Sequence, residues 1–453
     1  MPHLTLIKTN ALLRTNKYSI LCKISDVFTI NLDEFPFVRK ELDVDLVSYE
    51  ISVTLTAVEQ CLKYSVNGKK YSFAIPSLNQ PLNVLYTSCN NKYQAKVWLE
   101  IQRQHSTKPY HLAIGGGDQI YMDAVWELPS LAKWTALSSS AKLTAKISQP
   151  MISEITAFYK QKYEKKWFGS PEYADVLPNI PSINMWDDHD IFDGFGSYPS
   201  NVQKSDIVQT IYKIARRAFM IYQLHIKPDD ANKNLTYSYE INNTMFVSVD
   251  TRTERSITQI LSPATHTKIT TDIAASSAKN VVILLSTAMA FYNLDKISAL
   301  SSYLPTVETF SVLDYIPKLK ELYNVFGLPR YNDDMVDGWC DKVHTDETNE
   351  FVERLFAAKA GGKNVTIVVG DVHIGGDAYI ERNGIKISQY ISSGVGSITT
   401  KSFFDNMKLC SGNRTSDGIK YCFDKNTAIF DYNWGRLVVD TDIRFTHHTA
   451  PGK

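Results

Sequence analysis

Five short apolar segments, each followed within a few residues by Asp, His, Cys or Arg, constrain the fold of this chain most. They span residues 83–86, 110–114, 182–185, 245–249 and 365–369. Short runs of this kind, with helix-forming sequence between them, predict strands buried on both faces of a layered α/β sheet. Ligands of open α/β sheets bind beyond the carboxyl ends of the strands. We therefore expect the polar residues after these strands to meet at one site.

Three of the segments between the strands predict helices. They cover residues 151–168, 206–222 and about 348–358. In the second of these, the apolar residues recur on one face, as packing against a sheet requires. A further strand is expected at residues 281–285.

The first 80 residues predict a β-rich unit. Apolar and polar residues alternate strictly from Val47 to Thr56, which is typical of a strand with one buried face. Asn67-Gly68 lies between two alternating runs and predicts a β-hairpin, because its turn needs positive φ at both residues. We expect a β-rich N-terminal domain over residues 1–80 and a larger α/β domain over residues 81–453.

Charge and cysteine content narrow the classes of partner and compartment. Lys plus Arg and Asp plus Glu both number 48, so bulk charge gives no reason to expect nucleic acid as a partner. No apolar run reaches the roughly 18 residues of a membrane span. The N-terminal sequence lacks the features of a Sec or twin-arginine signal, and six scattered cysteines suit a reducing compartment. A cytoplasmic location is therefore expected.

The residues after the strands are rich in groups that bind metal ions. They are Ser88-Cys89, Asp118 with Tyr121, Asp187-Asp188-His189-Asp190 with Asp193, Asp250 with Arg252, and Asp371 with His373. Carboxylates and imidazoles crowded at one sheet edge repel one another and lose water, and a multivalent cation relieves both costs. Such ligands suit Mn, Fe, Zn or, in oxygen-rich sites, Ca.

Each of these pieces alone has a simpler interpretation. An Asp after a strand often caps a helix or stabilises a turn. Cys89 and Tyr121 are ordinary packing residues in many cores, and residues 187–190 are compatible with a solvated acidic loop. The order in which the pieces occur together is what favours a metal site.

Six blocks of this sequence resemble, in the same order, those of the PhoD-like alkaline phosphatase/phosphodiesterase family of metallophosphoesterases. The resemblance covers roughly residues 80 to 440. The blocks are Ser88-Cys89, residues 117–123 (GDQIYMD), 186–190 (WDDHD), 250–255 (DTRTER), Asp337-Gly338-Trp339 with Glu353-Arg354, and 370–373 (GDVH). The resemblance implies a four-layer αββα core of the calcineurin-like type after a small β-rich domain, with residues 81–453 as the catalytic domain.

The chain departs from the family pattern at four points. Asp193 stands where relatives often have Asn, and Asp190 replaces the more usual Glu. Residues 281–292 lack the Asn/Gln-rich ending of exported members, and an export signal is absent. The shorter acid and the missing signal resemble the intracellular branch of the family.

The resemblance also implies a set of metal ligands. Cys89, Asp118, Tyr121 and Asp371 correspond to ligands of a ferric ion, and Asp118 is the best candidate for bridging two ions. Asp188, Asp193 and His373 would hold a second ion or its neighbours. Iron is the expected metal, with calcium or Mn, Mg or Zn as alternatives.

Hydrolysis of a phosphate ester by metal-activated water is the expected reaction. Asp188, His189 and Arg252 are the candidate catalytic residues. His189 is interpreted either as the donor of a proton to the leaving group or as a structural residue or ligand. Arg252 is interpreted either as a fork for the phosphate or as a salt-bridge partner of Asp250 or Glu254. Asp250, Arg252, Arg255 and Trp339 are the candidate substrate-binding residues.

Two other functions are compatible with parts of the sequence. One is a catalytically degraded module that binds phosphate or a phospholipid. The other is a serine hydrolase that uses Ser392 to Ser397, but this loop lacks the G-x-S-x-G elbow of such enzymes. The expected substrate is a small phosphate ester, a phospholipid or a nucleotide, whether monoester or diester.

Overall fold

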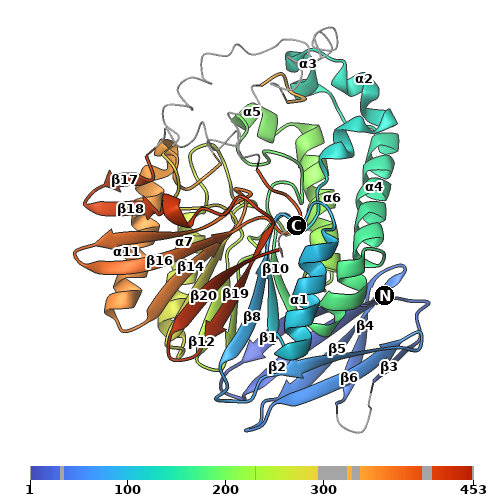
Figure 1. The fold of residues 1–453 in the computed structure, drawn as a ribbon. Helices are drawn as coiled ribbons and strands as arrows, with labels where there is room; N and C mark the ends of the chain where they lie inside the picture. Colours follow the sequence, from blue (N-terminus) through green and yellow to red (C-terminus); the bar gives the residue numbers. More distant parts are fainter. Residues whose placement is uncertain are drawn as a thin grey trace.

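The computed structural model describes residues 2–30, 35–229, 231–293, 324–328, 337–399 and 411–450. Two large sheets face each other, and helices cover their outer faces (Figure 1). This αββα arrangement confirms the predicted fold class.

The first sheet has nine strands and contains both early and late parts of the sequence. Its central strands β8, β9 and β10 are parallel to one another. In spatial order the strands are β20 (Ile443–Thr449), β19 (Asn433–Val439), β8 (Leu82–Thr87), β9 (Leu112–Gly116), β10 (Ser182–Met185), β1 (His3–Asn10), β2 (Thr15–Lys23), β5 (Leu46–Thr54) and β4 (Phe37–Asp43).

The second sheet has eight strands, of which β12, β13, β14 and β16 are parallel. Their spatial order is β11 (Tyr237–Ile241), β12 (Thr244–Ser248), β13 (Asn280–Leu285), β14 (Asn364–Val369), β16 (Ile385–Ser392), β15 (Gly375–Arg382), β18 (Ile419–Phe423) and β17 (Asn413–Ser416). A separate three-stranded sheet contains β3 (Phe28–Ile30), β6 (Gln60–Val66) and β7 (Lys69–Ile75).

Longer helices pack on the outer face of each sheet. Against the first sheet lie α1 (Ala95–Thr107), α4 (Gln149–Trp167) and α6 (Asp206–Tyr222), and against the second lie α7 (Pro263–Ala275) and α11 (Thr345–Ala360). Three shorter helices are α2 (Ala132–Thr135), α3 (Ser139–Thr144) and α5 (Ser200–Gln203). Within the described ranges, every helix is too short or too polar to cross a lipid bilayer.

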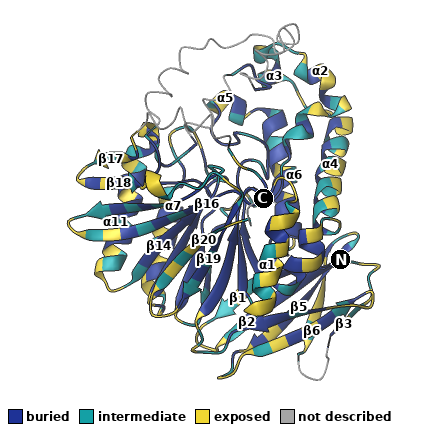
Figure 2. Ribbon diagram, viewed as in Figure 1, coloured by how far each residue is buried: buried dark blue, intermediate teal, exposed yellow. Residues whose placement is uncertain are grey.

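Apolar side chains form one core between the sheets and one under each helical layer. Val84 and Ile114 of the first sheet meet Val282 and Val368 of the second in the central core. Figure 2 shows that the strands are buried along most of their length, whereas exposed residues lie on the outer sides of the helices and on the edge strands. Burial on both faces explains why these strands are continuously apolar in sequence.

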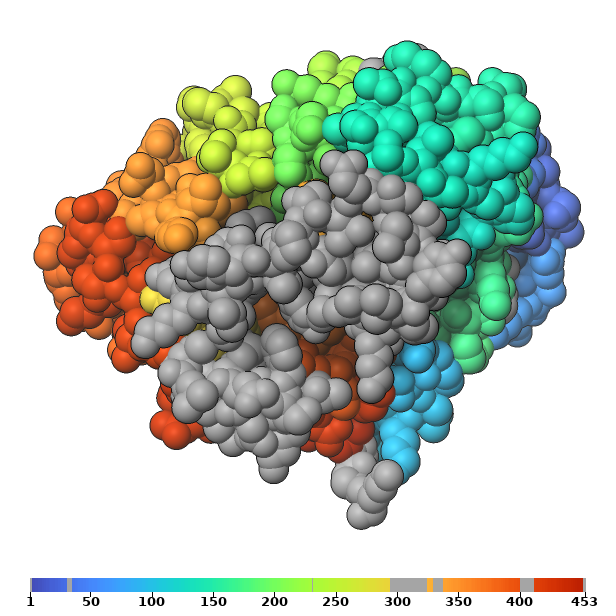
Figure 3. Space-filling model, turned by 90° about the horizontal axis from the view of Figure 1, so that it is seen from above, coloured from blue at the N-terminus to red at the C-terminus, as the bar shows by residue number. Residues whose placement is uncertain are grey.

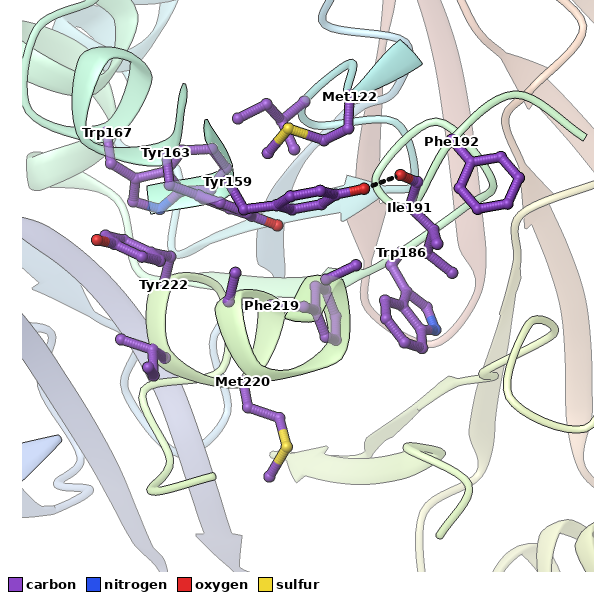
Figure 4. Close-up of a cluster of buried hydrophobic side chains, with 14 of the residues drawn as sticks. Met122, Tyr159, Tyr163, Trp167, Trp186, Ile191, Phe192, Phe219, Met220 and Tyr222 are labelled. Carbon is purple, nitrogen blue, oxygen red and sulfur yellow. Dashed lines mark hydrogen bonds between the residues drawn. The ribbon is translucent and has the colours of Figure 1, made fainter. Parts of the chain in front are cut away.

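Aromatic side chains join helices α4 and α6 to the loop after β10 (Figure 4). Tyr163 of α4 stacks on Tyr222 of α6, with ring centroids 4.8 Å apart. Phe219 of α6 stacks on Trp186, and the Tyr159 hydroxyl donates a hydrogen bond to the carbonyl of Ile191. The helical layer therefore holds the residues that follow β10 in place.

The first 75 residues do not form an isolated sheet. Strands β1, β2, β5 and β4 extend the nine-stranded sheet beyond β10, and β3, β6 and β7 form the separate sheet beside it. The region is β-rich, as expected, and the hairpin turn has positive φ at Asn67 (50°) and Gly68 (77°). A domain boundary near residue 80 remains a prediction.

Candidate metal centre

The loops after β8, β9, β10 and β14 meet where the two sheets come together. Backbone hydrogen bonds join these loops, since the N–H groups of Cys89 and Asn90 donate to the carbonyls of Gly117 and Asp118. Figure 3 views the molecule from above, with helices of the first layer in teal on one side and the strands β17 and β18 in red on the other. The predicted convergence of strand ends thus holds for these four strands.

Four residues in these loops have a left-handed backbone. The φ angles are 52° at Cys89, 55° at Asp118, 70° at Asp371 and 55° at His373. Such values cost free energy in residues other than glycine and are concentrated at functional sites. All four residues are predicted metal ligands, so the backbone strain is concentrated at the candidate metal centre.

A glycine lets the two sheets approach each other at this point. A Cβ atom on Gly370, which follows β14, would lie 2.6 Å from Oγ of Ser88 and 2.8 Å from the carbonyl oxygen of Gly116 in the first sheet. A side chain at position 370 would therefore push the strand ends apart.

Four carboxylates lie together at this junction. Asp118, Asp187, Asp188 and Asp371 each place an oxygen within 4.8 Å of the others. Burial, together with the neighbouring carboxylates, raises the pKa of Asp118 and of Asp371 well above the ordinary value. Burial likewise raises the pKa of Asp187 to about 6.

The carboxylate group has oxygens that the protein leaves unpaired. Oδ1 of Asp118 and Oδ2 of Asp187 are buried and have no hydrogen-bond partner among the described residues. Buried anionic oxygens of this kind are normally paired with a donor or a cation. The donor set therefore fits one or more multivalent metal ions.

Sulfur, phenol and imidazole ligands adjoin the carboxylates. Sγ of Cys89 lies 3.5 Å from Oδ2 of Asp118, and the Tyr121 hydroxyl lies 3.3 Å from the same oxygen. The hydroxyl is also 3.1 Å from Nε2 of His373. Cys89, Asp118 and His373 form a second possible set of metal ligands. Asp118 belongs to both sets, as expected of a bridging ligand.

His189 lies at the edge of the carboxylate group. Its Nδ1 contacts both oxygens of Asp123, at 2.9 and 3.0 Å, and its ring stacks on Tyr121 with centroids 4.2 Å apart. Burial disfavours the charged imidazole, but the carboxylates of Asp123 and Asp188 outweigh this effect and raise the pKa of His189 well above its ordinary value. His189 is thus held by Asp123 in one orientation.

The predicted substrate-binding residues lie inside the protein instead. The side chain of Arg252 is fully buried, and its guanidinium contacts Asp187 at 2.5 Å and Asp337 at 2.6 Å. Arg255 is also buried and bonds the carbonyl of Asp337. The salt-bridge partners of Arg252 are Asp187, Asp188 and Asp337, in place of the expected Asp250 or Glu254. A contact of Arg252 or Arg255 with a phosphate remains a prediction.

Asp250 and Trp339 are also buried. The carboxylate of Asp250 accepts hydrogen bonds from the indole of Trp186 and from the backbone N–H of Leu235, Arg252 and Thr253. Trp339 is fully buried in the core under the second sheet and stacks on Phe351. The contacts of both residues are therefore with the surrounding loops and core, and their role in substrate binding remains a prediction.

A third possible set of metal ligands contains Asp118, Asp188 and His189, and Asp193 belongs to none of the three sets. Its carboxylate is 3.9 Å from Nε2 of His189, and its backbone N–H donates to Asp123. Sequence reasoning missed Asp123, which holds His189, and Ser393, whose Oγ lies 3.0 Å from Sγ of Cys89. Asp123 ends a block that was recognised in the sequence, whereas Ser393 lies in the loop considered above only for a serine hydrolase.

Comparisons with known proteins agree with this arrangement. A family model described as PhoD related phosphatase matches residues 90–315. The chain belongs to the PhoD-related phosphatase family. Within this family match lie Asp118, Tyr121 and Asp188, whereas Cys89, Asp371 and His373 lie outside the matched residues.

Individual relatives extend the family assignment. The uncharacterized protein YGR266W of Saccharomyces cerevisiae is 26% identical over 401 residues, which cover 74% of this chain and 56% of that protein. The chain thus spans little more than half the length of that relative.

Two solved structures share the fold. PhoD has a TM-score of 0.61 at 12% identity, with 99% of this chain and 88% of that chain covered. A purple acid phosphatase from yellow lupin (Lupinus luteus) seeds has a TM-score of 0.50 at 10% identity, with 99% and 72% covered. At these identities the likeness is evidence for the fold.

Proposed function

We propose that this protein is a metal-dependent hydrolase of phosphate esters. The observation that carries the proposal is the group of four buried carboxylates, two of which have unpaired oxygens, at the joined ends of two sheets. Membership of a phosphatase family supports the same reaction.

The residues of the centre divide into two neighbouring ligand sets. Cys89, Asp118 and Tyr121, with Asp371 beside them, would hold an iron ion, because thiolate and tyrosinate favour a strongly Lewis-acidic metal. Asp188, with Asp371 and His373, would hold a second ion, for which calcium, manganese, magnesium and zinc are candidates. Asp187 is shared between this set and Arg252. Metal ions bound here supply Lewis acidity to phosphate oxygens and lower the pKa of bound water.

His189 is the proposed proton donor to the leaving group. Asp123 holds Nδ1 and leaves Nε2 directed to the other side of the ring, 3.9 Å from Asp193. A protonated imidazole held in this way adds positive charge and a transferable proton beside a phosphate. Because Arg252 and Arg255 are buried, no contribution from them to phosphate binding is required.

The proposed substrate is a small phosphate ester, either a monoester or a diester, with a nucleotide or phospholipid as a special case. The balance of charged residues gives no support for nucleic acid. The proposal includes a cytoplasmic location and a catalytic domain that begins near residue 81.

Elemental analysis combined with ester hydrolysis tests this function. Purified protein is expected to contain iron or another multivalent metal and to hydrolyse p-nitrophenyl phosphate, bis-p-nitrophenyl phosphate or both. Asp371→Asn should reduce the rate by at least about 100-fold, with its circular dichroism spectrum unchanged, because it removes a charged ligand. Metal-containing protein that binds phosphate but hydrolyses neither ester would favour a degraded, phosphate-binding module.

A further inference from the structure

Asp190 is a buried carboxylate beside the metal centre that takes no part in the ligand sets. It is fully buried and belongs to none of the possible ligand groups among the described residues. Its Oδ2 accepts hydrogen bonds from the backbone N–H of Asp118, at 2.8 Å, and from that of Asp187, at 2.9 Å. Its Oδ1 accepts a hydrogen bond from Nε2 of Gln223, also at 2.8 Å.

One oxygen of Asp190 therefore ties together the loops after two adjacent strands. Asp118 follows β9 and Asp187 follows β10. The N–H of Asp118 is held in this way at a residue whose φ is 55°, a conformation that needs support from its surroundings. Because both N–H groups bond the same oxygen, the side chain of Asp190 holds the two loops at a defined distance from each other.

The other oxygen connects this anchor to the helical layer. Gln223 directly follows α6, and its Nε2 also lies 3.1 Å from the hydroxyl of Tyr163 in α4. Gln223 and Asp190 are both fully buried, so water does not compete for the hydrogen bond between them. The packing of α4 against α6 thus sets the position of Asp190.

We propose that Asp190 is a positioning residue that sets the spacing between the candidate metal ligands Asp118 and Asp187, from whose backbone N–H groups it accepts hydrogen bonds. This inference rests on the proposed function, since it assumes that the carboxylates hold metal. Outer hydrogen bonds of this kind orient ligands, and their loss typically weakens metal binding by about 10-fold to 100-fold.

The variant Asp190→Asn separates the effect of hydrogen bonding from the effect of charge. All three partners of Asp190 are N–H donors. In Asp190→Asn one carboxylate oxygen becomes an N–H₂ group, which is also a donor and cannot accept a hydrogen bond from its partner. Oε1 of Gln223 has no partner, and a flip of this amide presents it to the new N–H₂. Asp190→Asn should therefore keep the loops in place, whereas the same change combined with Gln223→Leu should not.

The proposal is tested by titrating metal-free protein with Mn²⁺ alone and measuring the binding affinity by calorimetry. We expect Asp190→Asn to bind within about threefold of the wild-type affinity. Asp190→Ala and the double variant Asp190→Asn/Gln223→Leu should bind at least about 10-fold more weakly. Gln223→Leu alone should have a smaller effect, because both bonds to Oδ2 remain.

A matched control is Glu347→Ala. Glu347 also accepts two backbone N–H groups, those of Ile260 and Leu261, but lies outside the metal centre. This control should lower the unfolding temperature and leave Mn²⁺ affinity unchanged. If Asp190→Ala misfolds by circular dichroism, the double variant provides the same comparison.

Wild-type affinity in both Asp190→Ala and the double variant would overturn the positioning role and leave the proposed function standing. Equal losses in Asp190→Asn and Asp190→Ala would overturn it as well, because spacing by hydrogen bonds would not explain them. Wild-type protein that binds Mn²⁺ but hydrolyses no phosphate ester would overturn only the proposed function.

Discussion

Arg252 is the cation of a buried cluster that includes Asp187 and Asp337. Its side chain is fully buried, and it also donates to the carbonyl of Phe195. Asp337 in turn accepts hydrogen bonds from Arg252 and from the hydroxyl of Ser197, at 2.5 Å. The cluster fastens the loop after β10 to the segment that begins at Asp337. Its role is therefore to hold the centre's surroundings together.

Arg252→Ala should destabilise the fold as a whole. It leaves Asp187 buried without its cation, although Arg255 still pairs with Asp337, and breaking a buried pair typically costs about 3–5 kcal/mol. Urea denaturation measures the loss. Arg103→Ala, which removes an exposed pair with Glu100, should have little effect on stability, because solvent screens that pair. An Arg252→Ala protein of wild-type stability with impaired phosphate binding would instead support a direct contact with substrate.

Gly370→Ala tests the close approach of the two sheets. The added Cβ meets Ser88 and Gly116 at distances that no backbone rotation at residue 370 relieves, so we expect a loss of about 1–3 kcal/mol and weaker metal binding. Gly361→Ala is the control, because its φ is −74° and its nearest contacts are at 3.4 Å. Unfolding curves that coincide for the two variants would contradict the steric argument.

At the scale of elements, local patterns predicted more than long-range pairing. Strand β10 and helix α6 have the expected bounds. The apolar patterns that predict them depend only on residues within the segment itself. That β1, β2, β5 and β4 join the nine-stranded sheet was not predictable, because a local sequence pattern does not indicate which strand will be the partner. The same limit applies to Arg252, whose partners lie 65 and 85 residues away.

For the candidate site, the strand-end rule brought Asp118, Asp188 and Asp371 to one place, and the structure places them within one group. The location of the other predicted site residues depends on whether they are buried. Arginine and tryptophan in a recognised block indicate a role near the site, but sequence does not reveal whether they face solvent or the core. Trp339 and Arg255 face the core.

The junction between β1 and the segment after α6 should make stability depend on pH. Nδ1 of His3 lies 2.9 Å from Nε2 of His225, and both rings are buried. Burial lowers the pKa of His3 to about 3 and that of His225 well below its ordinary value. The unfolded chain then binds more protons than the folded one below about pH 6.5, so stability falls as pH falls.

Urea denaturation between pH 6 and pH 4 measures this dependence. His3→Gln should reduce the slope of unfolding free energy against pH by up to about 1.4 kcal/mol per pH unit, because it removes one titrating group. Thr5→Val changes a neighbouring buried hydroxyl without removing a histidine and should leave the slope unchanged. An unchanged slope in His3→Gln would show that His3 does not titrate on unfolding.

For the whole molecule, metal binding should contribute to global stability. The buried carboxylates repel one another, and a ligand that binds only the folded state stabilises it by about 2.7 kcal/mol at 100 times its Kd. We expect Mn²⁺ to raise the unfolding temperature of chelator-treated protein. The variant Asp118→Asn/Asp371→Asn should lose this response, and an equal response in that variant would place the ion elsewhere.

The nine-stranded sheet has a consequence for how the chain is made. Strand β8, which precedes Cys89, pairs with β9 on one side and with β19, residues 433–439, on the other. On the ribosome, β9 emerges soon after β8, whereas β19 follows only after on the order of tens of seconds of translation. During that interval β8 is an open edge that invites pairing with other nascent chains. The nine-stranded sheet is therefore incomplete until β19 is synthesised, and chains that stop before β19 should need chaperones to stay unaggregated.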